Sequence, residues 1–283
     1  MKRELNFEGR VNILYLVATP IGNLEDMSPR ALKVLNEVEY IAAEDTRTSG
    51  LLLSHFGINK PLISCHEHNE EEASKKITEL LSTGHSVAYM SDAGYPGISD
   101  PGERLVKAAL DQDIKVSVIS GPSALLHALV ASGLKSDHFY FHGFLESRDA
   151  ARKNELQELV NRPETLIFYE APHRIDKTLK GMFEVFGDRR ACIGRELTKI
   201  HEEYIRGNLG ELSQIDPATL RGEMVIVVEG CNTEITPVVS DEQIVKFVSS
   251  LTDVGISTKD AVRQASLVLK VNKNYIYKLY HTN

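Results

Sequence analysis

Short apolar runs alternate with amphipathic segments over the first 132 residues, and this alternation constrains the fold more than any other feature of the chain. The predicted strands are 12–18, 38–43, 61–65, 86–91 and 115–119, and the predicted helices are 28–37, 46–56, 69–83, 101–112 and 122–132. Consecutive parallel strands need a helical crossover between them, so this order is typical of a mostly parallel sheet covered by helices. The sequence therefore predicts an α/β fold.

A second series of elements follows a break at 132–136. It comprises strands at 138–144, 164–170, 190–196, 202–206 and 223–229, with a charged helix at 148–161. Residues 233–237 are predicted to form a linker, and the pattern of 241–283 is helical throughout. We therefore expect an N-terminal α/β domain at 1–121, a second α/β domain at 122–235 and a helical appendage at 236–283.

The loop from Ser91 to Gly102 contains three glycines, two prolines and two aspartates between a predicted strand and a predicted helix. Glycine lets the backbone approach a ligand closely, and ligands of open α/β sheets bind beyond the carboxyl ends of the strands. A lone Pro–Gly pair usually marks only a turn, but this run is longer than one chain reversal needs. It is a candidate ligand-binding loop.

A second loop of this kind follows the first strand, with the sequence Thr-Pro-Ile-Gly-Asn at 19–23. Ser28 and Pro29 then provide an N-cap and a first helical residue. Proline stands where the glycine of a dinucleotide-binding loop would be, so a pyrophosphate cradle is not expected. A flat, nucleoside-like ligand across the strand ends is favoured instead.

Polar clusters follow strands in both halves of the chain, at 44–47, 66–70, 169–174 and 195–203. This arrangement is expected around a cleft between two domains. His66 and His68 lack the further ligands that a metal site needs, so no metal is predicted. An N-cap at Asn69, followed by acidic residues in the first turn of a helix, accounts for that cluster more simply.

Composition excludes several classes of protein. The three cysteines are far apart, which fits a reducing cytoplasm and provides no disulfide framework. No apolar run has the ~18 residues of a transmembrane helix, and the first residues lack the apolar core of a secretion signal. The net charge of −8 argues against a general nucleic-acid binder.

The C-terminal segment departs from this acidic character. Residues 259–283 carry a net charge of +4, from five basic residues against Asp260. Two predicted helices joined by a short turn at 270–273 fit a helix-turn-helix that meets a polyanion, although a solvated helix face has the same pattern. Tyr275, Ile276 and Leu279 are expected in the core of this segment, with stacking of the tyrosines on bases as the alternative.

Seven motifs in this order resemble those of one family: 17–24, 43–47, 66–70, 91–102, 121–124, 169–174 and 195–203. The family is the tetrapyrrole methylase (class III) superfamily of S-adenosylmethionine-dependent methyltransferases, and within it the bacterial enzymes that act on small-subunit ribosomal RNA. The resemblance covers about residues 11–230, and the tail resembles the helix-turn-helix appended to the same enzymes. Tyr95 and Ser120 stand where many relatives have threonine and proline, which puts local packing in doubt.

The resemblance implies two α/β domains with S-adenosylmethionine bound in the cleft between them, and a homodimer. It implies 2′-O-methylation of a cytidine in the decoding region of 16S rRNA in the small ribosomal subunit. The implied cofactor-binding residues are Pro20, Ile21, Ser91, Asp92, Ala93, Gly94, Tyr95, Ile98, Ser123, Ala124 and Tyr169.

The candidate catalytic residues are Glu44, Asp45, Glu196 and Lys199, among which spacing alone does not decide. The candidate RNA-binding residues are Arg47, Arg174, Lys270, Lys273 and Lys278. Two alternatives stay open. A tetrapyrrole or protein side-chain methyltransferase of the same fold would not need the basic tail, and a non-catalytic ribosome-binding factor would not need the cleft.

Overall fold

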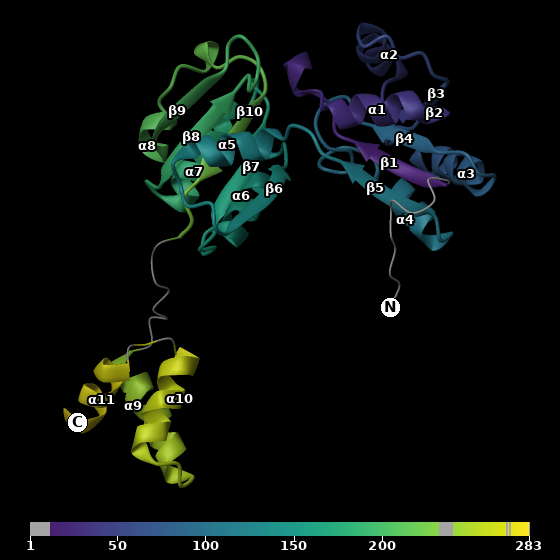
Figure 1. Cartoon of the computed structure of the whole chain (residues 1–283). Coiled ribbons are helices and arrows are strands. Elements are labelled where there is room, and N and C mark those ends of the chain that lie inside the picture. Colours follow the sequence, from purple (N-terminus) through teal and green to yellow (C-terminus); the bar gives the residue numbers. More distant parts are fainter. Residues whose placement is uncertain (1–11, 232–239, 270, 272, 283) are drawn as a thin grey trace. The chain divides into compact units, whose positions relative to one another are not determined.

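The computed structural model describes residues 12–231, 240–269, 271 and 273–282 (Figure 1). It forms two compact units. The larger contains the described residues up to Glu158 together with Glu164–Glu229, and the smaller contains Leu159–Pro163 and the described residues from Gly230 onward. The linker predicted at 233–237 lies outside the described residues. The division into 1–121, 122–235 and 236–283 stays a prediction.

The first sheet of the larger unit is parallel throughout its described pairings, as the alternation predicts, with the strand order β3-β2-β4-β1-β5. Its strands are β1 (Ile13–Val17), β2 (Tyr40–Ala43), β3 (Leu62–Ser64), β4 (Val87–Met90) and β5 (Lys115–Ile119). All four residues of β4 are fully buried, because helices cover both faces of the sheet.

Four α-helices cover this sheet: α1 (Pro29–Glu37), α2 (Thr46–His55), α3 (Glu70–Ser82) and α4 (Glu103–Asp111). The apolar sides of α1 and α2 share one cluster with β1, β2 and β4, and those of α3 and α4 pack in a second cluster. The short 3₁₀ helix η1 (Leu24–Asp26) lies between β1 and α1. As predicted, α1 begins at Pro29, and the Ser28 hydroxyl accepts a hydrogen bond from the Ala31 N–H at 3.1 Å.

The second sheet has the order β6-β7-β10-β8-β9. Its strands are β6 (Phe139–Phe144), β7 (Thr165–Glu170), β8 (Arg190–Arg195), β9 (Glu203–Asn208) and β10 (Met224–Val228). β6 and β7 run parallel, but β7–β10, β10–β8 and β8–β9 are antiparallel. The parallel arrangement predicted from the alternation over the first 132 residues therefore does not extend to this sheet. The connection at 196–202 is too short for a crossover helix, so it makes β8 and β9 a hairpin.

The remaining helices of the larger unit are α5 (Ala124–Ser132), α6 (Asp149–Leu159), α7 (Ile175–Phe186), α8 (Leu209–Leu212) and the 3₁₀ helix η2 (Pro217–Thr219). Ala128 and Leu129 of α5 pack against β7, β8 and β10. The sequence analysis did not predict α7. The chain leaves the first sheet after β5 and enters α5, which lies over the second sheet beside β8 and β10 (Figure 1).

The smaller unit contains α9 (Asp241–Asp253), α10 (Thr258–Leu269) and α11 (Lys273–Thr282), which share a core of their own. Ile276 is fully buried and Leu279 packs against this core, as predicted. The prediction for Tyr275 is wrong, because the residue is 47% exposed and its hydroxyl donates a hydrogen bond to Asp241 Oδ1 at 2.8 Å. Among the described residues, no helix is long and apolar enough to cross a bilayer.

Candidate functional site

The loops that follow β1 and β4 are joined to each other at the carboxyl edge of the first sheet. Thr19 N–H donates to the Gly94 carbonyl at 2.9 Å, and Gly94 N–H donates to the Thr19 carbonyl at 3.1 Å. The buried Thr19 hydroxyl adds a bond to the Ser91 carbonyl at 3.1 Å. Gly94 has φ +76°, a backbone conformation that favours glycine. The two loops thus form one continuous floor.

The β4 loop is also anchored at its far end. The buried carboxylate of Glu70 accepts hydrogen bonds from Gly102 N–H at 2.9 Å and Arg104 N–H at 3.1 Å, and so caps the start of α4. The Tyr89 hydroxyl lies 3.1 Å from the Pro101 carbonyl oxygen. A Cβ on Gly102, where φ is +139°, would lie 3.0 Å from the Tyr89 ring. The loop is therefore held close against the sheet.

Asn69 precedes α3 as predicted, but its side chain does not cap that helix. Its Oδ1 accepts instead from His66 N–H at 2.8 Å, and its amide donates to the Ser64 carbonyl at 3.2 Å. The acidic residue that follows, Glu70, serves α4 rather than its own helix. Within the described residues, no group of three His, Cys, Asp or Glu side chains is arranged to hold a metal ion.

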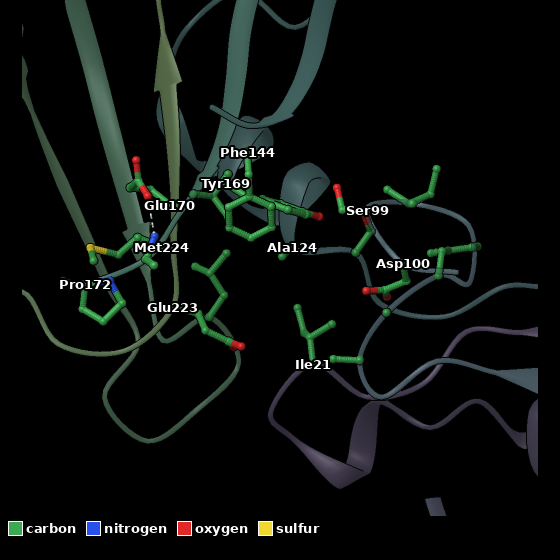
Figure 2. Close-up of a pocket in the computed structure, with 18 residues that line it drawn as sticks. Ile21, Ser99, Asp100, Ala124, Phe144, Tyr169, Glu170, Pro172, Glu223 and Met224 are labelled. Carbon is green, nitrogen blue, oxygen red and sulfur yellow. Dashed lines mark hydrogen bonds between the residues drawn. The ribbon is translucent and has the colours of Figure 1, made fainter. Parts of the chain in front are cut away.

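A cavity of about 320 Å³ lies above this floor (Figure 2). We call it the main cavity. Its other walls come from the start of α5, the ends of β6 and β7, and the start of β10. Eight of the predicted cofactor residues line it: Ile21, Ala93, Gly94, Tyr95, Ile98, Ser123, Ala124 and Tyr169.

Sequence reasoning missed ten lining residues: Ser99, Asp100, Phe144, Glu170, Ala171, Pro172, Leu197, Glu223, Met224 and Val225. Ser99 and Asp100 belong to the glycine-rich loop that the sequence analysis identified as a candidate ligand-binding loop, so their position in the sequence could have predicted them. Phe144 and Met224 stand at strand ends without any motif. Figure 2 shows Phe144 and Tyr169 across the cavity from Ile21, and Met224 beside Pro172. The order of strands in the second sheet brings Phe144 and Met224 to the main cavity.

Three predicted cofactor residues line a different hollow. Pro20, Ser91 and Asp92 border a second pocket, also of about 320 Å³. Its remaining walls are Gly22, Leu24, Thr48, Ser49, Leu51, Leu52 and His55. The segment Pro20–Gly22 borders both hollows, with Ile21 lining the main cavity and Pro20 and Gly22 lining the second pocket.

Acidic side chains near the main cavity hold protons more tightly than usual. Burial raises the pKa of Asp100 to about 6, and the neighbouring Glu44 carboxylate adds to the shift. Burial also raises the pKa of Glu44, as does repulsion from Asp92. Burial raises the pKa of Asp92 itself. A pKa of about 6, as at Asp100, is typical of a group that exchanges protons near neutral pH.

Asp45 has the opposite character. The Arg47 side chain donates two hydrogen bonds to this carboxylate, from Nε to Oδ1 at 3.1 Å and from Nη2 to Oδ2 at 2.8 Å. The backbone N–H of Arg47 also donates to Oδ1 at 2.8 Å. These hydrogen bonds lower the pKa of Asp45 to about 2. Asp45 is the N-cap of α2, and the Arg47 side chain remains 88% exposed. A carboxylate held in this way is a poor proton acceptor.

Glu196 and Lys199 pair with each other in the loop between β8 and β9. Lys199 Nζ lies 3.0 Å from Glu196 Oε1 and 3.4 Å from Glu223 Oε2. Burial lowers the pKa of Lys199, but the hydrogen bond to Glu196 and the nearby Glu223 outweigh it, so the pKa is raised. The hydrogen bond from Lys199 lowers the pKa of Glu196. Both groups are therefore charged at neutral pH.

This loop also touches the β1 loop. Asn23 N–H donates to the Thr198 hydroxyl at 3.1 Å, and a Cβ on Gly22 would lie 2.4 Å from Lys199 Cγ. Glu196 and Thr198 have φ values of +50° and +66°. Strained backbone of this kind persists where surrounding contacts over-determine it, and it clusters at functional sites. Thr198 and Lys199 therefore contact the β1 loop at the edge of the site.

Arg174 is held by residues at the ends of β6 and β7. Its Nε lies 2.5 Å from the buried carboxylate of Glu170, and its Nη2 donates to the Leu145 carbonyl at 2.6 Å. The Thr178 hydroxyl donates to the other Glu170 oxygen. Since the Arg174 side chain is 16% exposed, its contacts are structural ones. Of the predicted tail cations, Lys273 and Lys278 are exposed, and Lys270 lies outside the described residues.

Residues 13–213 match the model of the family described as tetrapyrrole (corrin/porphyrin) methylases. The chain is 42% identical over 292 residues to "Ribosomal RNA small subunit methyltransferase I" of Bacillus subtilis, covering 99% of each chain. It is 43% identical to the protein of the same name from Synechocystis sp., covering 95% of this chain and 97% of that one.

Solved structures share the fold at low identity. Uroporphyrin-III-C-methyltransferase from Thermus thermophilus aligns with a TM-score of 0.56 and 19% identity, covering 77% of this chain and 94% of that one. The cobalamin biosynthetic enzyme cobalt precorrin-4 methyltransferase, CbiF, aligns with a TM-score of 0.57 and 15% identity, covering 77% and 95%. At these identities the alignments show a common fold.

Proposed function

Because the chain belongs to the family of tetrapyrrole methylases, we propose that it methylates ribosomal RNA of the small subunit, at the 2′-oxygen of a cytidine in 16S rRNA. The methyl donor is S-adenosylmethionine. The observation that carries the proposal is the main cavity, formed where the glycine-rich β4 loop and the β1 loop face the second sheet. The near full-length similarity to proteins named as ribosomal RNA methyltransferases supports the substrate class.

The main cavity fits this cofactor in size and chemistry. Its volume of about 320 Å³ lies in the range of about 300–1,000 Å³ that holds small ligands. Ile21, Phe144 and Met224 offer apolar surface to an adenine ring, and Asp100 and Glu223 offer carboxylates to a cationic ligand. When bound, S-adenosylmethionine supplies an electrophilic methyl group on a positively charged sulfur.

The residues of this chain then have to orient the acceptor hydroxyl and remove its proton. Orientation is worth several kcal/mol of barrier, and a positioned base adds about 10²–10⁴-fold. We propose that the Asp100 carboxylate accepts this proton, because its pKa of about 6 lies near the operating pH and it lines the main cavity. Glu44 remains the second candidate, since its pKa is also raised.

The other predicted catalytic residues are proposed for different roles. Asp45 orders the start of α2 and holds Arg47, whose exposed guanidinium is a candidate phosphate contact. Glu196 and Lys199 hold the β8–β9 loop against Gly22 and so support the floor of the site.

The basic tail is proposed to bind the small subunit. Residues 259–283 carry +4, which leaves −12 on the rest of a chain whose total charge is −8. An acidic body repels RNA at long range, so a basic segment has to offset the repulsion. Lys273 and Lys278 on α11 are exposed to solvent.

We also propose that the protein is a homodimer and that it works in the cytoplasm. Helix α5 exposes Leu126 and Val130, which are four residues apart and 46% and 79% accessible. Apolar side chains at this spacing share one face of a helix and are typical of an interface. Light scattering should give twice the chain mass, and Val130→Glu should shift the protein toward the monomer. A monomeric wild-type protein would contradict this part.

The decisive experiment offers labelled S-adenosylmethionine to assembled small subunits, naked ribosomal RNA and a tetrapyrrole in parallel. Methyl transfer to a cytidine ribose in either RNA sample supports the proposal. Transfer to the tetrapyrrole would establish the alternative methyltransferase, and binding of subunits without any transfer or cofactor affinity would establish a ribosome-binding factor.

A further inference from the structure

The second pocket shares its wall with the main cavity. Along both loops, neighbouring residues face the two hollows in turn: Ile21 lies between Pro20 and Gly22, and Asp92 precedes Ala93. The β1 and β4 loops therefore border both hollows. The position of the second pocket suits a group that must reach the cofactor while staying outside the cofactor site.

One polar group in this pocket lacks a partner in the protein. Ser49 on α2 is 1% exposed, and its hydroxyl has no hydrogen-bond partner among the described residues. Buried hydroxyls are normally satisfied, because an unsatisfied one costs folding stability. A ligand with a hydrogen-bonding group would satisfy Ser49, which lines the pocket.

The remaining walls combine apolar surface with one carboxylate. Leu51 and Leu24 line this pocket and are 75% and 42% exposed, so they offer apolar surface to a ligand. Asp92 lies at the side next to the main cavity, and its Oδ1 is 3.4 Å from Asp45 N–H. Apolar walls suit the faces of a base, and aspartate accepts hydrogen bonds from the amino group of cytosine.

We propose that the second pocket receives the base of the acceptor nucleotide, an amino-bearing pyrimidine turned out of its stack. The inference rests on the proposed function and names the part of the site that selects the acceptor. Asp92 accepts from the exocyclic amino group, and Ser49 bonds to a ring nitrogen or the carbonyl oxygen. Arg47, which precedes Thr48 on α2 and is 88% exposed, is placed to meet a phosphate of the same strand.

The test measures methyl transfer to small subunits that carry cytidine or uridine at the acceptor position. Asp92→Asn is expected to reduce the preference for cytidine over uridine by about tenfold or more, since the carboxylate that reads the amino group is lost. Ser49→Ala is expected to raise KM for subunits severalfold at unchanged cofactor affinity. Ser74→Ala is the matched control, because Ser74 is also buried with an unpartnered hydroxyl but lies on α3, outside both hollows.

The outcomes separate this inference from the proposed function. If the wild-type protein transfers no methyl group to any small-subunit RNA, the proposed function fails and the inference fails with it. If the wild type is active but Asp92→Asn keeps its preference and Ser49→Ala matches Ser74→Ala, the pocket does not bind the acceptor base. If calorimetry shows that Asp92→Asn loses cofactor affinity in proportion to rate, the pocket belongs to the cofactor site and the inference is overturned. Thermal unfolding of each variant confirms that it is folded.

Discussion

Asp100 is the residue at which stability and activity should oppose each other. Burial, and then the nearby Glu44, raises its pKa from 3.8 to about 6, so the folded protein binds this proton more tightly than the unfolded chain does. The protonated Asp100 therefore makes its full contribution to the free energy of unfolding below pH 3.8, and this contribution is lost as the pH rises through about 6. At pH 8 the ionised carboxylate destabilises the fold. The Ser91 hydroxyl donates a hydrogen bond to the Asp100 carboxylate, and Asp100→Asn removes the charge while keeping an oxygen that can accept this bond.

The size of the effect follows from the shift. Two pKa units correspond to about 3 kcal/mol at about 1.4 kcal/mol per unit. Asp100 is partly accessible to water, and solvent screening reduces this to about 1–1.5 kcal/mol. We expect Asp100→Asn to raise the free energy of unfolding by about this amount at pH 8, which is about 2–6 °C in Tm for a chain of this size. At pH 3.8 and below, the gain should vanish.

The same substitution should lower the rate of methyl transfer at pH 8 by about 10²-fold or more, if Asp100 accepts the proton of the hydroxyl. The wild-type rate should rise with pH and level off above about 6. Urea unfolding at several pH values and single-turnover methylation of small subunits measure both effects. Asp111→Asn, an exposed position on α4 outside the main cavity, controls for the loss of one negative charge.

Two results would refute this reasoning. A stability gain that persists undiminished at pH 3.8 would mean that the substitution acts through packing rather than charge. An unchanged rate in Asp100→Asn would remove Asp100 as the base and leave Glu44 as the candidate.

Three further changes test other parts of the site. Gly94→Val should weaken cofactor binding about tenfold or more in calorimetry, because φ is +76° at this position and a valine side chain strains the loop there; the variant should still fold. Unchanged affinity would remove the β4 loop from the cofactor site. Glu170→Gln should lower the free energy of unfolding by about 3–5 kcal/mol in urea, because the largely buried Arg174 loses the carboxylate that neutralises its charge; a loss below about 1 kcal/mol would contradict this role. Truncation before Asp241 should leave cofactor affinity intact, weaken binding to the small subunit severalfold and make that binding less dependent on salt. Replacing Lys270, Lys273 and Lys278 together should reproduce most of the loss of subunit binding. Normal binding by the truncated chain would deny the tail this function.

Local sequence determined where most elements of this protein begin and end. The five strands of the first sheet lie where apolar runs predict them, and Ser28 and Pro29 start α1, because periodicity and capping depend on residues a few positions apart. The glycine-rich loop was recognisable for the same reason. Its residues carry conformational preferences that do not depend on distant partners.

Tertiary structure decided which residues line the main cavity and how the pKa values of the nearby carboxyl groups differ. The sequence showed neither the antiparallel order of the second sheet nor the approach of Phe144 and Met224 to the β4 loop, since strand order is a non-local property. It also left Glu44 and Asp45 as equivalent candidates for the base and did not single out Asp100. Their pKa values diverge because one meets Arg47 at the surface and the others are buried beside like charges, and burial exists only after the chain has folded.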